Sequence, residues 1–183
     1  MRILVDVDDT VSDFEGSLRQ LLECYPELKD RYKADSWDWF RKDHKVEAVC
    51  EEALADWGFW RQLPLLSGAG EGIAYLRSQG HELMWCTMPY KKCFGWADAR
   101  REWLEEKLQI NLYKEPLITV SGGEKYLVRA TTIIDDKVPF VEAWEKKNNS
   151  IGFVIAASTN VGYHQRYTWE DIIKNKFFLR KIL

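Results

Sequence analysis

The strongest constraint on the fold comes from residues 2–10, which read RILVDVDDT. The apolar, β-favouring beginning of this segment predicts a strand, and three aspartates, Asp6, Asp8 and Asp9, follow within four positions. Because side chains alternate along a strand, Asp6 and Asp8 point to the same side. Two carboxylates this close repel each other unless a cation binds there or one of them is protonated. The segment therefore indicates a site for Mg2+, a hard cation that takes one or two carboxylates together with substrate phosphate.

Strand-like segments alternate with helix-like segments along most of the chain. Nearly continuous apolar runs, typical of strands covered on both faces, occur at 2–7, 82–87, 117–120, 131–135 and 151–156. Patterns that predict helices cover 69–79, 96–108 and 138–147. Alternation of this kind favours an α/β fold with a parallel sheet flanked by helices.

Residues 14–67 interrupt this alternation. They contain two predicted helices, near 14–24 and 45–57, and no convincing strand. We interpret the segment as a small helical cap inserted after the first strand, with a core built from 1–13 and 68–183. The 183 residues are enough for one core with an insertion of this size.

Aromatic side chains are unusually dense in this predicted cap. They are Trp37, Trp39, Phe40, Trp57, Phe59 and Trp60. Clustered tryptophans suggest a surface on which a flat ligand stacks. A small cap also needs a core of its own, so roughly half of these tryptophans are expected to pack inside it.

Charge and cysteine content limit the partners. The chain has 26 Lys+Arg and 29 Asp+Glu, a formal net charge of −3, so no broad basic field is available for long nucleic acids. Cys24, Cys50, Cys86 and Cys93 form no C-x-x-C pair and do not gather with histidines, which argues against zinc. With no signal-peptide pattern, we expect reduced, buried thiols in a cytoplasmic protein. No apolar run approaches the ~18 residues of a membrane-spanning helix, and a homodimer is left open.

Polar side chains follow three of the predicted strands. Asp6 and Asp8 follow the first, Thr87 ends the second, and Asp135 ends the fourth, with Lys125 a short distance before it. Ligands of doubly wound sheets bind beyond the carboxyl ends of the strands. We therefore expect these side chains to converge in one pocket.

The same motifs resemble those of the haloacid dehalogenase-like (HAD) phosphatases, and in particular their 5′(3′)-deoxyribonucleotidase branch. The resemblance rests on Asp6 through Asp13-Phe14, on Cys86-Thr87-Met88-Pro89, on Lys125 ahead of Ile134-Asp135-Asp136-Lys137, and on Trp169 through Ile172. It covers nearly the whole chain, although the cap is matched only loosely. It implies a Rossmann-like parallel sheet with a cap inserted after the first strand.

The resemblance also implies a reaction. It predicts a Mg2+-dependent phosphatase that hydrolyses deoxyribonucleoside monophosphates through an aspartyl-phosphate. Asp6 would be the nucleophile. Asp8 would protonate the leaving oxygen and then activate water, which requires Asp8 to hold a proton in the first step.

Ligands for the metal and the phosphate follow from the same resemblance. The Asp6 side chain, the Asp8 backbone carbonyl and the Asp135 side chain would bind Mg2+, and Asp136 would support its waters. The phosphoryl oxygens would be held by the Thr87 hydroxyl, the Lys125 ammonium and the Met88 backbone N–H. Asp136 has a second interpretation as a helix N-cap.

The base would stack in the cap. Phe14 corresponds to the family's base-stacking phenylalanine, and stacking contributes roughly 1–3 kcal/mol per base. Further candidates, by region only, are Trp39, Phe40, Phe59 and Trp60.

The chain departs from this branch at three points, one of which is the order of the cap aromatics. Met88 stands where many members have serine. The segment from Thr87 to Cys93 is short, so the lysine that members carry there corresponds either to Lys91 or to Lys92. These departures bear on substrate preference more than on the chemistry.

Two alternatives stay open. The first is a phosphatase of the same mechanism acting on another small phosphorylated metabolite. The second is a catalytically silent module that binds a nucleotide, which would be expected to lack Asp6 or Asp8. A nucleic-acid 3′-phosphatase is disfavoured by the missing basic stretch and by the covering insertion.

Overall fold

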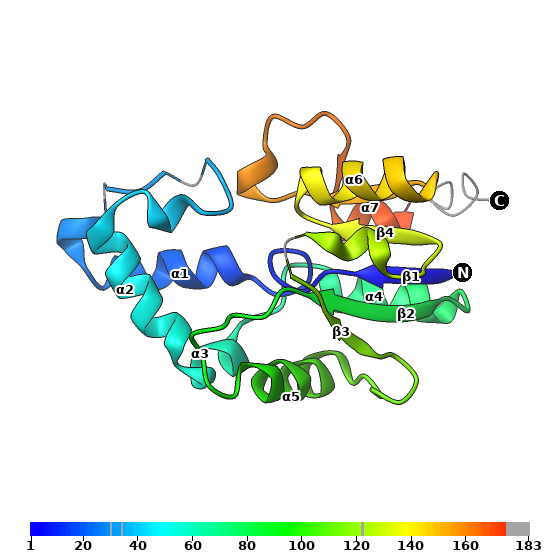
Figure 1. Cartoon of the computed structure of the whole chain (residues 1–183), viewed down its shortest axis with the longest axis horizontal. Coiled ribbons are helices and arrows are strands. Elements are labelled where there is room, and N and C mark those ends of the chain that lie inside the picture. Colours follow the sequence, from blue (N-terminus) through cyan, green and yellow to red (C-terminus); the bar gives the residue numbers. More distant parts are fainter. Residues whose placement is uncertain (30, 34, 122, 175–183) are drawn as a thin grey trace.

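Six parallel strands form one sheet in the computed structural model, which describes residues 1–29, 31–33, 35–121 and 123–174 (Figure 1). The strands are β1 (Arg2–Val5), β2 (Glu82–Thr87), β3 (Leu117–Thr119), β4 (Thr132–Asp135), β5 (Gly152–Ile155) and β6 (Arg166–Tyr167). Their order is β3-β2-β1-β4-β5-β6, so β1 lies between β2 and β4. Ile3 of β1 pairs with Leu83 on one side and with Thr132 on the other. The predicted α/β class with a parallel sheet is confirmed.

The five predicted strands are all present, each ending within two residues of the expected position. The sequence does not predict β6, because a strand of two residues has no alternation that a pattern could detect. It adds an edge to the sheet beside β5, where Ile155 pairs with Tyr167.

Helices connect the strands and build the cap. The α-helices are α1 (Phe14–Glu23), α2 (His44–Ala55), α3 (Trp57–Gln62), α4 (Ala69–Ser78), α5 (Trp96–Leu108), α6 (Val138–Asn148) and α7 (Trp169–Lys174). Short 3-10 helices are η1 (Pro26–Leu28), η2 (Trp39–Arg41), η3 (Glu124–Leu127) and η4 (Ser158–Asn160). None of the described helices combines the length and the apolar character that a bilayer crossing requires.

The prediction of one helix over 45–57 is wrong at its C-terminal end. α2 ends at Ala55, and α3 begins two residues later. The carboxylate of Asp56 accepts a hydrogen bond from the backbone N–H of Gly58 at 2.9 Å, which starts a new helix with a changed direction.

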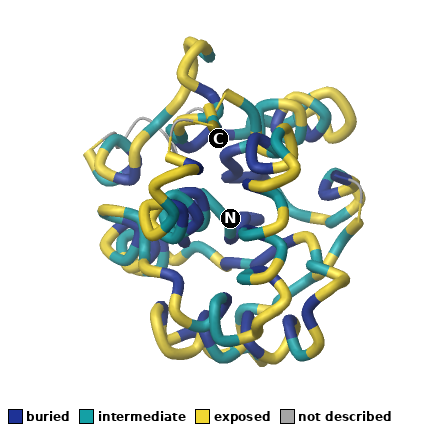
Figure 2. Tube along the Cα trace, turned by 90° about the vertical axis from the view of Figure 1, so that its left-hand side faces the viewer, coloured by how far each residue is buried: buried dark blue, intermediate teal, exposed yellow. Residues whose placement is uncertain are grey.

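The two faces of the sheet are covered unequally. Ile3 and Val5 pack in the larger apolar cluster with side chains of α4, α5 and α7. Leu4, between them in sequence, points to the opposite face and packs with Trp144 of α6. Figure 2 shows the resulting distribution: buried segments run through the middle of the molecule, and exposed turns surround them.

The segment 14–67, here called the cap, begins and ends at neighbouring points of the core. The backbone N–H of Asp13 donates to Pro64 O at 2.9 Å, and that of Leu66 donates to Val11 O at 2.9 Å. The two connections therefore run side by side, and α1 and α2 extend to one side of the sheet (Figure 1). The division into core and cap stays a prediction that this geometry supports.

The cysteines are free thiols. Cys50, Cys86 and Cys93 are buried as predicted, and burial raises the pKa of the Cys50 and Cys86 thiols to about 12. The prediction is wrong for Cys24, which is exposed because it follows the last turn of α1.

Candidate active site

The ends of three strands bring the predicted polar residues together. Asp6 follows β1, Thr87 ends β2 and Asp135 ends β4. The backbone N–H of Asp6 still donates to Ile134 O at 2.9 Å, so the sheet fixes its position beside β4. Asp6, Thr87, Asp135 and Lys125 are each at most 3% exposed. The predicted convergence at the carboxyl edge is therefore present, inside the protein.

Lys125 is placed between two of these carboxylates. Its ammonium group forms ion pairs with Asp6 and, at 2.6 Å, with Asp135 Oδ2. Burial by itself lowers the pKa of Lys125, but the facing Asp135 and Asp6 carboxylates outweigh it and raise that pKa above its usual range. Lys125 is thus a permanent cation at neutral pH. It lies on η3, a single 3-10 turn, where the sequence predicts the start of a longer helix.

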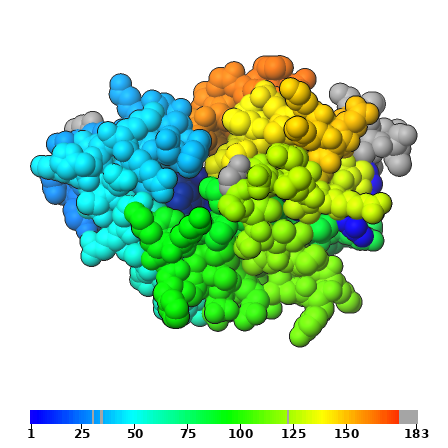
Figure 3. Space-filling view, in the orientation of Figure 1, coloured from blue at the N-terminus to red at the C-terminus, as the bar shows by residue number. Residues whose placement is uncertain are grey.

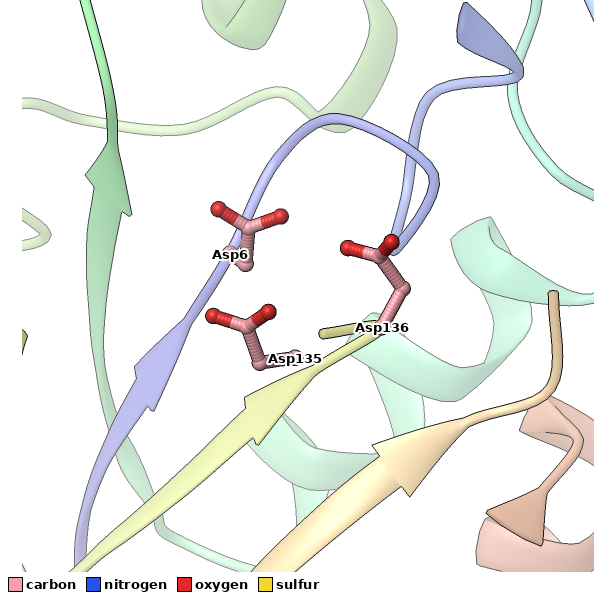
Figure 4. A group of neighbouring side chains, drawn as sticks. All are labelled: Asp6, Asp135 and Asp136. Atoms are coloured by element: carbon pink, nitrogen blue, oxygen red, sulfur yellow. The ribbon is translucent and has the colours of Figure 1, made fainter. Parts of the chain in front are cut away.

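Three carboxylates form a compact group. Asp6, Asp135 and Asp136 each offer an oxygen, and these oxygens lie within 4.8 Å of one another (Figure 4). The Thr10 hydroxyl lies 3.2 Å from Asp6 Oδ2 and accepts the backbone N–H of Asp136 at 3.0 Å. Burial raises the pKa of Asp135 and, more strongly, of Asp136. Buried oxygens that share a small volume fit a hard divalent cation such as Mg2+.

Asp136 does not act as the N-cap of α6. That helix begins after Lys137, and no side-chain capping bond is present at its start. The side-chain amide of Asn160 instead donates to the carbonyls of Asp136 and Ile155, at 2.8 and 2.7 Å. Asn160 thus fixes the loop that carries Asp136, a role that the sequence does not signal.

Asp8 contacts residues outside the acidic group. Its Oδ1 accepts from the Ser12 hydroxyl at 3.2 Å, and its Oδ2 accepts from the Thr87 hydroxyl at 3.5 Å. The guanidinium of Arg100, on α5, forms an ion pair with Asp8 Oδ1. Burial lowers the pKa of Arg100 to about 9, which leaves it cationic at neutral pH. Arg100 is not among the site residues predicted from the sequence.

A cavity of about 110 Å3 opens from these residues toward the cap. Asp6, Asp8, Thr87, Met88 and Lys125 line its core side. Its other walls come from Phe14, Trp37, Phe40, Arg41, Leu54, Trp60, Tyr90, Lys137 and Phe140, with Asp9 and Pro89 at its edges. Figure 3 shows the surface hollowed between the cap and the green and yellow segments of the core.

A larger hollow, of about 520 Å3, lies between α1 and the segment that follows β5. Asp9 lines both cavities, but Asp6, Thr87 and Lys125 do not line the larger one. We place the candidate active site at the smaller cavity because the convergent polar groups face it.

The comparisons with known proteins identify the family. The model of the family described as "5′ nucleotidase, deoxy (Pyrimidine), cytosolic type C protein" matches residues 1–178. The chain belongs to this family. The predicted resemblance to the deoxyribonucleotidase branch is therefore confirmed.

Relatives and solved structures agree with this family. The chain is 27% identical over 147 residues to the mitochondrial 5′(3′)-deoxyribonucleotidase of Homo sapiens, and 26% identical over 145 residues to that of Mus musculus. Each match covers 75% of this chain and 62% or 64% of the relative, so the chain matches less than two thirds of their length.

Two solved structures share the fold. A HAD family hydrolase from Deinococcus radiodurans has a TM-score of 0.61 at 13% identity, covering 100% of this chain and 96% of that one. A haloacid dehalogenase-like hydrolase from Xanthomonas campestris has a TM-score of 0.54 at 13% identity, covering 100% and 95%. The predicted HAD-like Rossmann-type fold is thereby confirmed.

The cap aromatics of this nucleotidase-family chain divide into two groups. Phe14 and Trp60 line the cavity and stack on each other, with ring centroids 5.5 Å apart and planes 17° apart. Phe40 also lines it. Phe59 packs edge-on against Phe14 and Trp60 but is absent from the cavity wall.

Trp39 does not reach the cavity either. It is 2% exposed and packs 4.8 Å from Tyr32 inside the cap. Its neighbour Trp37 is 51% exposed, lines the cavity, and has Lys137 Nζ 5.9 Å from its ring. The sequence places both tryptophans in the aromatic cluster but assigns the site role to Trp39.

Neither candidate lysine after Thr87 lines the cavity. Lys91 and Lys92 are exposed, and Lys92 Nζ donates to Glu51 of α2 at 2.7 Å. The Tyr90 hydroxyl donates to the same carboxylate. This loop of the family member is thus tied to the cap through Glu51, and Lys92 contacts the cap rather than the cavity.

Proposed function

We propose that the chain is a Mg2+-dependent phosphatase that hydrolyses deoxyribonucleoside monophosphates through an aspartyl-phosphate on Asp6. The observation that carries the proposal is the group of Asp6, Asp135 and Lys125 at the carboxyl edge of the sheet, in a chain of a deoxynucleotidase family. A buried carboxylate beside a fixed cation is suited to attack a phosphate dianion, because the cation offsets the repulsion between them.

In the first step, an Asp6 oxygen attacks the phosphorus, and the bond from phosphorus to the ester oxygen breaks. The ester oxygen keeps the electron pair and takes a proton from Asp8, so the deoxynucleoside leaves neutral. In the second step, Asp8 takes a proton from water, whose oxygen attacks the phosphorus. The bond to Asp6 breaks, phosphate leaves, and both carboxyl groups return to their starting state.

The phosphoryl group would be held by three groups of the core. Lys125 supplies a point charge, Thr87 a hydroxyl donor, and Met88 its backbone N–H. Mg2+ would be held by the Asp6 and Asp135 side chains and the Asp8 carbonyl, with Asp136 as a further oxygen donor. When bound, the ion neutralises charge on the phosphate and orients it for in-line attack.

The cavity's size bears on how the nucleoside enters. Its volume of about 110 Å3 is well below the ~300–1,000 Å3 typical of small-molecule sites. A phosphate fits this space, whereas a whole nucleotide requires the cap side chains to move outward. The base would then lie against Phe14 and Trp60, with Trp37 at the rim.

A phosphate-release screen tests the proposal. The panel contains the deoxyribonucleoside monophosphates, their ribose counterparts and common sugar phosphates, each with Mg2+ and with EDTA. We expect Mg2+-dependent release from deoxyribonucleotides that Asp6→Asn abolishes while its circular dichroism spectrum stays unchanged. Faster release from a sugar phosphate would support the alternative substrate class. Appreciable release by Asp6→Asn would contradict the nucleophile assignment.

Location and oligomeric state stay predictions. The free thiols support a reducing compartment such as the cytoplasm, although the two relatives above are named as mitochondrial. The possible homodimer is tested by size-exclusion chromatography with light scattering.

A further inference from the structure

Arg100 is a buried cation at a position where α5 is otherwise apolar. It lies on the same helix face as Trp96 and Trp103, and its side chain has no exposed surface. Its guanidinium lies 4.9 Å from the ring centroid of Trp60 and 5.7 Å from that of Trp103. These two indoles, one from the cap and one from the core, fix where the guanidinium can lie.

The charge of Arg100 faces two carboxylates: the Asp6 carboxylate acts to raise its pKa, and Asp8 forms an ion pair with it. Within the described part of the chain, its ion-pair partner is Asp8 and no other. Its three guanidinium nitrogens, Nε, Nη1 and Nη2, are buried without a hydrogen bond among the residues described. The contact that remains is the ion pair between Nη2 and Asp8 Oδ1.

Stability alone does not account for an arginine here. Replacing a buried ion pair by apolar residues of similar volume is often neutral or stabilising. A methionine at position 100 would fill the space between Trp60 and Trp103 without a buried charge. Packing alone therefore does not require a cation at this position.

Asp8 needs an anchor that its other contacts do not provide. The Ser12 and Thr87 hydroxyls lie 3.2 and 3.5 Å from its two oxygens, both long for O–H···O bonds. The ion pair with the buried guanidinium of Arg100 is a further contact to this carboxyl group. Without it, only the two long hydroxyl contacts hold Asp8.

We propose that Arg100 is a positioning residue that holds the Asp8 carboxyl group in place for proton transfer to and from the substrate. The proposal rests on the proposed acid and base role of Asp8. Arg100 touches Asp8 and not the cavity, so it acts through Asp8. Arg100 also contacts Trp60, so the same side chain touches both Asp8 and the aromatic wall of the cavity.

Kinetics on two substrates test this role. Arg100→Met is expected to lower kcat for a deoxyribonucleoside monophosphate roughly tenfold or more, since positioned acid–base groups contribute about 10²–10⁴-fold. KM should stay within about threefold, because Arg100 itself does not line the cavity. The second step is the same for both substrates, so they are compared by kcat/KM, which reports the first step. Its loss should be clearly smaller for p-nitrophenyl phosphate, whose leaving group needs little protonation. Arg100→Lys should recover part of the rate, and equal losses in kcat/KM on both substrates would overturn the proposal.

The exposed neighbour provides the control. Arg101 forms an ion pair with Asp98 at 3.3 Å on the surface of α5, so Arg101→Met should leave both rates unchanged. Circular dichroism and thermal melting check that each variant folds. If Arg100→Met does not fold, Arg100→Lys carries the test, because the shorter ammonium side chain loses the fixed fork that holds Asp8.

A double-mutant cycle separates positioning from a general structural effect. In an Asp8→Asn background, Arg100→Met should lower kcat by less than about twofold, because the group that it positions is already gone. If the two substitutions lower kcat by factors that multiply in the double variant, Arg100 does not act through Asp8, and the role of Asp8 is unaffected. Full activity of Asp8→Asn by itself would instead contradict the proposed function.

Discussion

The ammonium group of Lys125 lies 2.6 Å from Asp135 Oδ2 and is also paired with Asp6, although Asp6 follows β1 and Asp135 ends β4. The pairing joins β1 to β4 at the point where the chemistry is proposed. One cation thereby balances the proposed nucleophile and a proposed metal ligand. We expect this buried group, rather than any single contact, to make the carboxyl edge able to accept a phosphate.

Removing this cation should affect both activity and stability. Lys125→Met keeps the length of the side chain but leaves two buried carboxylates unpaired, which typically costs about 3–5 kcal/mol of unfolding free energy. We expect lost turnover and a lower midpoint of urea unfolding, partly restored by Mg2+. Lys92→Met, on the exposed Lys92, is the matched control and should change stability by less than about 1 kcal/mol. A Lys125→Met protein with the wild-type midpoint would contradict the buried pairing.

The metal-free protein should lose stability as the pH rises. Burial raises the pKa of Asp135 and Asp136 above the ordinary 3.8, so the folded state binds protons more tightly than the unfolded state. Their stabilising contribution is present at low pH and declines from about pH 4 upward, through the raised values. Mg2+ binds the ionised carboxylates, so its stabilising effect should grow over the same interval.

Thermal melting at pH 5, 6, 7 and 8 checks this, with EDTA and with Mg2+. Asp136→Asn is the internal control, because it removes the more strongly shifted group. The difference in Tm between the wild type and this variant should change with pH in EDTA. A Mg2+ effect on Tm that is constant from pH 5 to 8 would show that these carboxylates do not titrate as proposed.

The positions of Asp6, Thr87 and Asp135 could be predicted because they need only strand assignment. The ends of parallel strands meet at one edge of a sheet, so a polar residue at each end is brought to the same place whatever the loops do. The strands themselves are readable because they are nearly continuous apolar runs. This part of the site follows from local sequence and one topological rule.

The roles of Trp37, Trp39 and Arg100 depend on packing instead. Trp39 begins η2 and turns inward, whereas Trp37 remains at the surface, and no periodicity distinguishes them in a segment with so little regular structure. Arg100 occupies a position in the buried stripe of α5, with Trp96 and Trp103 three or four residues away. That spacing is a usable signal for a buried arginine, but its partner Asp8 follows from the assembled fold alone.

Substitution of Trp37 and of Trp39 should have different effects on stability and activity. Trp39→Ala removes a side chain that is 2% exposed and should cost about 3–5 kcal/mol of unfolding free energy. Trp37→Ala removes one that is 51% exposed and should change stability by less than about 0.5 kcal/mol. Its kcat/KM for deoxyribonucleotides should nevertheless fall about fivefold or more, because its ring lines the cavity. If Trp39→Ala instead lowers kcat/KM and Trp37→Ala lowers stability, the substrate role belongs to Trp39.

Phe14 and Phe59 offer a matched pair for base stacking. Both rings pack against Trp60, but Phe14 lines the cavity and Phe59 does not. Stacking contributes roughly 1–3 kcal/mol per base, so Phe14→Ala should lower kcat/KM for a deoxyribonucleotide about 5-fold to 100-fold. The same variant should affect p-nitrophenyl phosphate far less, since its ring is not held by the cap. Phe59→Ala should lower stability and change the ratio of the two rates little. If Phe14→Ala slows both substrates equally, the ring serves packing and the base binds elsewhere in the cap.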